Sequence, residues 1–217
     1  RTVRVSAAKT GKHAVLTLAG MDTEFDKSVA DQLSGPLEHL LRNAVDHGIE
    51  APETRLAAGK PLAGQIRLEA SHQGAHLVIR LSDDGAGLDY ERIRGRAADL
   101  GWMTADQAAS LDNNDLERLI LEPGFSTADA VSEISGRGVG LDAAASSVQA
   151  LRGRLSVQSK PGQGTDFTLR LPVSLAVAKT MIVEAGLGRF AVPMVNFTRA
   201  LRVQHEELEV RDGQSGI

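Results

Sequence analysis

The sequence predicts an α+β fold, in which paired strands and amphipathic helices follow one another along the chain. Two strand pairs support this prediction: 65–71 with 76–82, and 153–159 with 165–171. Apolar and polar residues alternate in each pair, which is the period of a half-buried strand. The third observation is the stretch from His39 to His47, whose apolar residues recur at helical spacing.

Composition indicates a folded chain with an aliphatic core. The 217 residues are 42% hydrophobic but only 3% aromatic, so Leu, Val, Ile and Ala must fill the core. The net charge of −4 argues against nucleic-acid binding, and the absence of cysteine excludes disulfides and thiolate metal sites. No apolar run is long enough to insert into a membrane. Because the chain begins with Arg1 and shows no signal peptide, we expect part of a longer, cytoplasmic protein.

Periodicity and turn residues predict the remaining elements. Alternation at 3–5 and 14–18 predicts two short strands or a hairpin. One helix is expected to begin near Ser28, and the central helix follows Gly35-Pro36 and ends before Ala51-Pro52. Further helices are predicted at 90–100, 112–122 and 141–151. A β-rich pattern follows Pro172, with strands at 180–184, 190–193 and 201–203.

The central helix carries an unusual polar face. At about 100° per residue, it places His39, Arg42, Asn43, Asp46 and His47 on one side and apolar residues on the other. This face offers hydrogen-bond donors for phosphate oxygens and the amide oxygen of Asn43 for a hard cation, which suits a polyphosphate with its metal. A solvated face that happens to hold two histidines explains this stretch equally well.

Two glycine clusters lie at junctions between elements. Asp83 ends a strand, and Gly85 and Gly87 are expected to let backbone pass close to a ligand, where the carboxylate could accept a hydrogen bond from an amine such as adenine N6. A tight turn capped by the aspartate is the alternative. The segment Gly136-Arg-Gly-Val-Gly140 opens a helix and could bind an anion, although it matches neither the Walker nor the Rossmann spacing.

Five elements in order resemble the motifs of a known ATP-binding superfamily. The helix with Asn43 is similar to the N box of the GHKL superfamily, and the Asp83 turn is similar to its first glycine box. Phe125-Ser-Thr127 is similar to the F box. The second glycine cluster and Gly162-x-Gly-Thr165 are similar to the second and third glycine boxes. Within it, residues 36–50, 123–127, 135–142 and 169–176 resemble the CheA class of chemotaxis histidine kinases.

This resemblance implies a fold and a domain organisation. Residues 1–172 are expected to form the Bergerat (GHKL) catalytic domain, a two-layer α/β sandwich with a mixed sheet covered by helices. Residues 173–217 are expected to begin an incomplete, β-rich, SH3-like domain that resembles the CheW-like regulatory domain of this family.

The resemblance also implies roles for individual residues toward ATP and Mg²⁺. Asn43 would bind the metal; His39, Arg42 and His47 would lie near the phosphates, and Asp46 could orient Arg42 or His47. Asp83 would bind the adenine amine, with Thr165 nearby through ordered water. The other expected nucleotide-binding residues are Gly85, Gly87, Arg92, Arg96, Ser126, Thr127, Gly136, Arg137, Gly138, Val139, Gly140 and Leu141. For Arg92 and Arg96, a solvated helix face is an equal alternative.

The function implied is transfer of the ATP γ-phosphoryl group to a histidine on a separate phosphotransfer domain. Implied partners are that domain, a CheW-like coupling protein, chemoreceptors and, indirectly, a response regulator, with dimerisation through a segment outside this chain. Two alternatives remain. One is an ATP-driven conformational machine, which is disfavoured because His39 stands where such ATPases carry a general-base Glu. The other is a pseudokinase or scaffold that docks a coupling protein.

Overall fold

The computed structural model describes residues 1–125, 140–172, 180–186, 188–193, 209–211 and 214–216. The chain divides into two compact units, Arg1–Ser174 and Leu175–Ile217. The first holds every sequence-derived site residue. In the part of the chain that the structure describes, no helix combines the length and apolar character needed to cross a membrane.

A five-stranded mixed sheet forms the centre of the first unit, in the order β1-β2-β3-β5-β4. Its strands are β1 (Ala14–Ala19), β2 (Gly64–Gln73), β3 (His76–Asp83), β4 (Arg154–Lys160) and β5 (Gly164–Pro172). The β1–β2 pair is parallel, and the other pairs are antiparallel. The predicted α+β fold with a mixed sheet is therefore confirmed, as are both predicted strand pairs.

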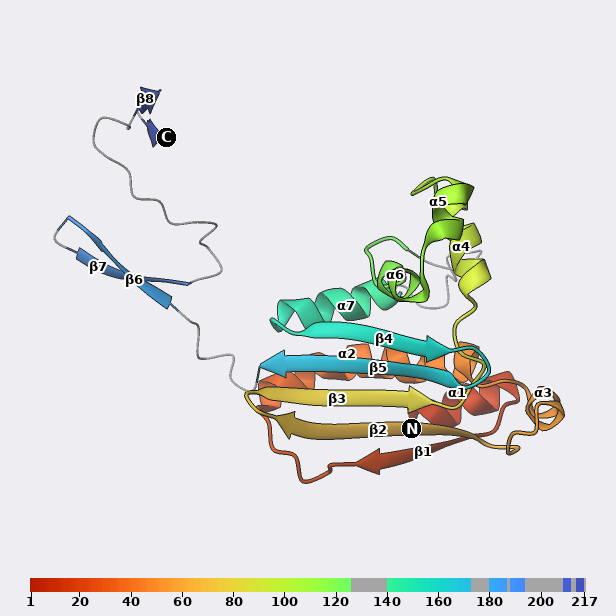
Figure 1. Ribbon diagram of the computed structural model, residues 1–217. Helices are drawn as coiled ribbons and strands as arrows, with labels where there is room; N and C mark the ends of the chain where they lie inside the picture. Colours follow the sequence, from red (N-terminus) through yellow and green to blue (C-terminus); the bar gives the residue numbers. More distant parts are fainter. Residues whose placement is uncertain (126–139, 173–179, 187, 194–208, 212–213, 217) are drawn as a thin grey trace. The chain divides into compact units, whose positions relative to one another are not determined.

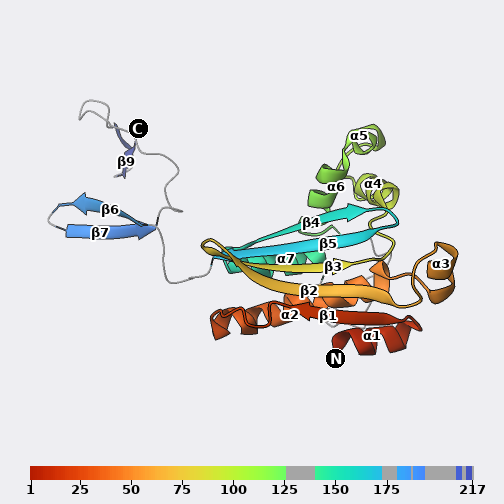
Figure 2. The ribbon, with the colours of Figure 1, turned by 60° about the horizontal axis from the view of Figure 1, so that its bottom comes forward.

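Three helices cover one face of this sheet: α1 (Thr2–Thr10), α2 (Lys27–Asn43) and α7 (Leu141–Ala150) (Figures 1 and 2). The buried layer between them is aliphatic and includes Leu33, Leu40, Val148, Ile66 and Leu169. Polar residues line up on the opposite face, where for example Arg80 and Ser156 both pair with Thr168. The unit is thus a two-layer sandwich with one covered and one polar sheet face.

The predicted strand at 3–5 is wrong, because residues 2–10 form the helix α1. Val3 and Ala7 are buried four residues apart, whereas Val5 is 60% exposed. The burial period is therefore helical, and the apparent alternation of Val3 with Val5 carried no strand signal. Of the two strands predicted at 3–5 and 14–18, only the second is found in the sheet, as residues 14–19.

The helix α2 runs through Pro36 without a break, although the sequence suggested two helices separated there. Val29, Leu33, Pro36 and Leu40 are all buried at helical spacing, so continuous packing offsets the hydrogen bond that proline removes. Asp26 caps the start by accepting a hydrogen bond from the Ser28 N–H.

A π-helical turn, η1 (Ala44–Gly48), follows directly on α2. The Ile49 N–H donates to the Ala44 carbonyl at 2.7 Å, five residues back. The helical conformation therefore ends at Gly48, a few residues before the predicted limit at Ala51-Pro52. Single π-turns of this kind are frequent at functional sites.

Among the described residues, four short helices connect the strands: α3 (Pro52–Ala57), α4 (Tyr90–Asp99), α5 (Ala105–Ser110) and α6 (Asn113–Leu119). The helices α4, α5 and α6 lie together beyond one end of the sheet (Figure 1). Sequence reasoning missed α5, although Thr104 and Gln107 form a capping box that signals its start. Asp112 caps α6.

The described residues of the second unit form two antiparallel strand pairs. One joins β6 (Thr180–Ala185) to β7 (Gly188–Pro193), and the other joins β8 (Glu209–Arg211) to β9 (Gln214–Gly216). The predicted strands at 180–184 and 190–193 are confirmed, and the one at 201–203 lies outside the described residues. Its SH3-like identity stays a prediction.

Candidate functional site

Asp83 is a buried carboxylate at the end of β3. Only 7% of the residue is exposed, and its Oδ1 accepts a hydrogen bond from the Gly85 N–H at 2.9 Å. Burial raises the pKa of Asp83 to about 6, against the opposing effect of hydrogen bonds from the backbone of Gly85 and Thr165. At neutral pH the group is therefore mostly ionised and acts as a buried hydrogen-bond acceptor.

Packing within the protein also requires glycine at positions 85 and 87. A Cβ on Gly85 would lie 2.1 Å from the Gly48 carbonyl oxygen, and one on Gly87, whose φ is 76°, would lie 2.6 Å from the Lys160 carbonyl oxygen. The Ala86 N–H donates to the Gly48 carbonyl at 2.9 Å. Glycine is thus required because the turn packs tightly between η1 and the β4–β5 hairpin.

A buried ion network holds the other side of this turn. The Arg55 guanidinium is fully buried and pairs with Glu50 Oε2 and Asp84 Oδ2, each at 2.8 Å. Lys60 Nζ contacts Glu50 Oε1 at 2.7 Å and donates to the carbonyls of Asp84 and Gly85. The sequence pattern predicts a polar connection with a helical turn at 52–64, and it gives no sign of this network because Asp84 lies 29 residues from Arg55 in sequence.

On the polar side of α2, Asn43 and His39 form a hydrogen-bonded pair. The Asn43 Nδ2 lies 2.9 Å from the His39 Nε2. An amide nitrogen only donates, so Nε2 accepts and the ring proton resides on Nδ1. Burial, together with the nearby Arg42 charge, lowers the pKa of His39, with Asp142 opposing, and this favours the neutral imidazole.

This pair fits a hard cation. The His39 contact engages the amide nitrogen of Asn43, and the amide oxygen takes no part in it. Within the described ranges, no group of three or more His, Asp or Glu side chains could hold a metal. A lone protein oxygen suits Mg²⁺, which typically keeps waters and substrate phosphates as its other ligands.

Lys12 holds the backbone on either side of the peptide bond between Val45 and Asp46. Lys12 Nζ donates to the carbonyl oxygens of Val45 and Asp46, at 3.0 and 2.6 Å. Among the described residues, the buried Asp46 Oδ1 has no hydrogen-bond partner, so this atom is not bound to Arg42 or His47. Lys12 had no predicted role at this site.

The other sequence-derived residues divide by location. Thr165 is 6% exposed and pairs in register with Asp83 across β3 and β5. Arg42 and His47 are exposed, as is Arg92 on α4, whereas Arg96 is half-buried. Gly140 caps α7 and Leu141 begins it. Residues 126–139, which contain Ser126, Thr127, Gly136, Arg137, Gly138 and Val139, lie outside the described residues.

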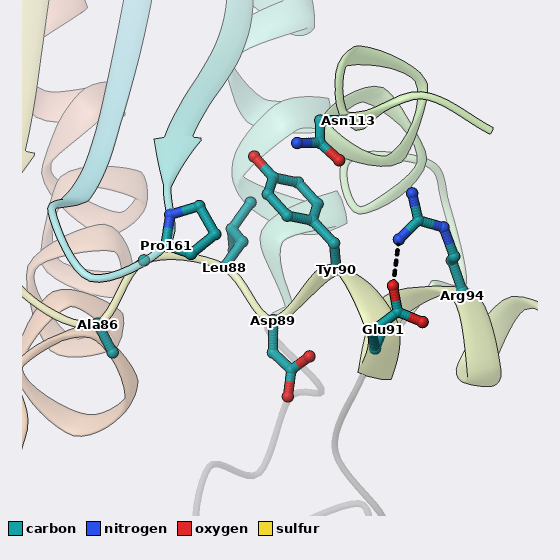
Figure 3. A pocket seen from close by; sticks show the side chains of 9 residues that line it. Ala86, Leu88, Asp89, Tyr90, Glu91, Arg94, Asn113 and Pro161 are labelled. Carbon is teal, nitrogen blue, oxygen red and sulfur yellow. Dashed lines mark hydrogen bonds and ion pairs between the residues drawn. The ribbon is translucent and has the colours of Figure 1, made fainter. Parts of the chain in front are cut away.

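A hollow of about 490 Å³ adjoins the first glycine turn. Its lining comes from residues 86–91, from Arg94 and Asn113, and from Pro161 in the β4–β5 turn (Figure 3). Figure 3 shows Leu88 between Pro161 and the Tyr90 ring. Neither Asn43 nor Asp83 lines it, so it is a neighbour of the candidate nucleotide site.

Comparisons with known proteins agree with this geometry. Over 202 residues, the chain is 48% identical to the chemotaxis protein CheA of Rhizobium meliloti, covering 93% of this chain and 26% of that protein. It is 40% identical over 208 residues to CheA of Bacillus subtilis, covering 96% of this chain and 31% of that one. The gliding motility regulatory protein of Myxococcus xanthus is 42% identical over 207 residues, covering 95% of this chain and 27% of that one.

The chain thus spans about a quarter to a third of the length of these relatives. Residues 32–192 match the family of histidine kinase-, DNA gyrase B-, and HSP90-like ATPases. That range contains Asn43, His39, Asp83 and Thr165, the residues of the candidate site. The chain therefore belongs to the histidine kinase-, DNA gyrase B-, and HSP90-like ATPase family.

Proposed function

We propose that this chain is the ATP-binding catalytic domain of a chemotaxis-type histidine kinase, which transfers the γ-phosphoryl group of ATP to a histidine on a separate phosphotransfer domain. The observation that carries the proposal is the Asn43–His39 pair, together with the buried acceptor Asp83 at the end of β3. The similarity to two chemotaxis proteins named CheA supports it.

The chain's own residues bind and orient in this proposal. Asp83 accepts a hydrogen bond from the adenine amine, and Thr165 supports the same end of the site. His39 holds the Asn43 side chain through Nε2, so that the amide oxygen is directed away from the imidazole. Asn43 would hold Mg²⁺ there, and the metal would supply charge neutralisation at the phosphates, which with positioning accounts for nearly all catalysis in phosphoryl transfer. Arg42 would add positive potential on the exposed side of the helix, where His47 also lies.

His39 also bears on the alternative of an ATPase. A general base for hydrolysis needs a lone pair directed at water, whereas the Nε2 lone pair accepts the Asn43 N–H and Nδ1 carries the ring proton. We therefore propose that His39 positions Asn43 and does not activate water. This arrangement favours phosphoryl transfer to a protein acceptor over ATP hydrolysis.

The partners and the setting follow from the same proposal. A histidine phosphotransfer domain would supply the acceptor imidazole, and a response regulator would receive the phosphoryl group later. The segment after residue 172 would begin a CheW-like domain that docks a coupling protein and chemoreceptors. Dimerisation would use a segment outside this chain, and the protein would act in the cytoplasm.

Calorimetric titration with Mg·ATP tests the binding step. We expect saturable binding that is lost in Asn43→Ala, while Asn114→Ala, an exposed asparagine on α6, leaves it unchanged. If the chain binds no ATP, the proposal is contradicted and the scaffold alternative is favoured. Adding the cognate phosphotransfer domain and γ-labelled ATP then tests the kinase: label on the domain is expected, and label only in free phosphate favours the ATPase.

A further inference from the structure

We propose that Ser159 sets the base preference of the nucleotide site by fixing the direction of the Thr165 hydroxyl proton, so that the site offers acceptors to the base. The inference concerns specificity and rests on the proposed ATP function. It starts from Ser159 at the end of β4, a residue to which sequence reasoning gave no role.

The hydrogen bonds around the Ser159 hydroxyl assign its proton. The Leu88 N–H donates to Ser159 Oγ at 2.8 Å, and the Gly164 carbonyl oxygen lies 2.9 Å from it. A carbonyl only accepts, so the single Ser159 proton is directed at Gly164. Thr165 Oγ1 lies 3.1 Å away on the neighbouring strand. Because Ser159 has no second proton, Thr165 must be the donor in this contact.

Thr165 therefore faces a ligand as an acceptor. Its proton is committed to Ser159, which leaves only a lone pair for a bound base or its water. Asp83, in register beside it on β3, is also an acceptor when ionised. Two adjacent buried acceptors suit a base with an exocyclic amine, such as adenine, and oppose guanine, which carries a carbonyl at the same position. A site discriminates strongly against a ligand that leaves the buried polar groups of the site unpaired.

A second layer fixes the backbone of Ser159. Glu117, only 7% exposed, accepts hydrogen bonds from the Ser159 N–H at 2.8 Å and from the Tyr90 hydroxyl at 2.7 Å. The Tyr90 hydroxyl also lies 2.8 Å from the Ser159 carbonyl oxygen. Burial and the Glu117 carboxylate raise the pKa of Tyr90. Figure 3 shows Tyr90 reaching from the start of α4 toward the hairpin that carries Pro161.

These contacts keep Ser159 in place, so that its hydroxyl can fix the direction of the Thr165 hydroxyl proton. The Ser159 N–H donates to Glu117 on α6, and the Ser159 hydroxyl donates to the Gly164 carbonyl on β5. Hydrogen bonds to buried partners restrict the rotation of a side chain. Without the Ser159 hydroxyl, the Thr165 hydroxyl could rotate and donate to a carbonyl on the base.

The test compares ATP and GTP affinity by calorimetry, both as Mg²⁺ complexes, on the full 217-residue chain. We expect Ser159→Ala to lower the preference for ATP over GTP about tenfold, the effect of one misdirected hydrogen bond. Ser159→Thr restores the hydroxyl and the preference. The matched control is Ser156→Ala on the same strand, where the hydroxyl bonds the Thr168 carbonyl and the preference should not change.

A double-mutant cycle separates positioning from mere support of the fold. In a Thr165→Val background there is no hydroxyl to direct, so Ser159→Ala should no longer alter the ATP-to-GTP ratio. If Ser159→Ala does not fold, Ser159→Cys replaces it, because a thiol keeps the volume but is a weak donor and acceptor.

Three results overturn the inference while leaving the proposed function intact. The first is an unchanged ratio in Ser159→Ala, and the second is an equal loss of affinity for both nucleotides. The third is a Ser159→Ala effect that persists in the Thr165→Val background. Wild-type chain that binds neither nucleotide contradicts the proposed function itself, and the inference falls with it.

Discussion

Replacing Asp83 by Asn should stabilise the fold at neutral pH while abolishing ATP binding. The carboxylate is 7% exposed, and burial raises its pKa from 3.8 to about 6. A raised pKa means that ionising this group costs free energy in the folded state that it does not cost in the unfolded chain. Asparagine, like the protonated acid, avoids that cost but cannot serve as the anionic acceptor that the site needs.

The magnitude follows from the shift in the Asp83 pKa. A difference of about 2 units corresponds to roughly 3 kcal/mol at 1.36 kcal/mol per unit. We expect Asp83→Asn to raise the free energy of unfolding by about 2 kcal/mol at pH 8, because the bulkier amide recovers less than the full amount. The cost of ionisation is complete above pH 6 and disappears as the pH falls toward 3.8. The difference between the two proteins should therefore shrink to nearly zero at pH 4.

Urea unfolding of both proteins at pH 8, 6 and 4 measures this difference. The neighbouring Asp84→Asn is the matched control, because Asp84 is ion-paired with the buried Arg55. That variant should lose stability at pH 8, which is the opposite sign. An Asp83→Asn protein that is less stable than wild type at pH 8, or a difference that does not change with pH, would refute the electrostatic argument.

Three further predictions follow from the same turn. ATP affinity should fall about tenfold per unit as the pH drops below about 6, because protonated Asp83 no longer offers its anionic acceptor; calorimetry at pH 5 and 7.5 checks this, and equal affinities contradict it. Arg55→Met should lower the free energy of unfolding by about 3–5 kcal/mol, since it leaves Glu50 and Asp84 without their buried partner. The control Arg67→Met removes an exposed ion pair and should change the free energy of unfolding by less than about 0.5 kcal/mol. Urea unfolding measures both. Gly85→Ala should lower the melting temperature, because its Cβ would lie 2.1 Å from the Gly48 carbonyl oxygen, while Gly95→Ala in the open on α4 should raise stability by up to about 1 kcal/mol; equal effects from calorimetric melting would contradict this.

The sequence alone determined the features that depend on local pattern. Alternation identified β2, β3, β4 and β5, since each has one covered and one polar face. Helical spacing placed Asn43 and His39 one turn apart on the polar side of a helix, which made their hydrogen bond possible. The glycine-rich turn after Asp83 was recognisable because a break directly after a strand limits what the chain can do there.

Features that depend on partners distant in sequence were decided only by the tertiary structure. Val3–Val5 looks like a strand until the burial of Ala7 shows a helix, and Pro36 looks like a break until its packing is seen. Gly85 is required by the carbonyl of Gly48, and Arg55 is tied to Asp84, 29 residues away. The proton of Thr165 is directed by Ser159 across two strands. No local pattern encodes these contacts, because each is set by how separate elements pack around the same turn.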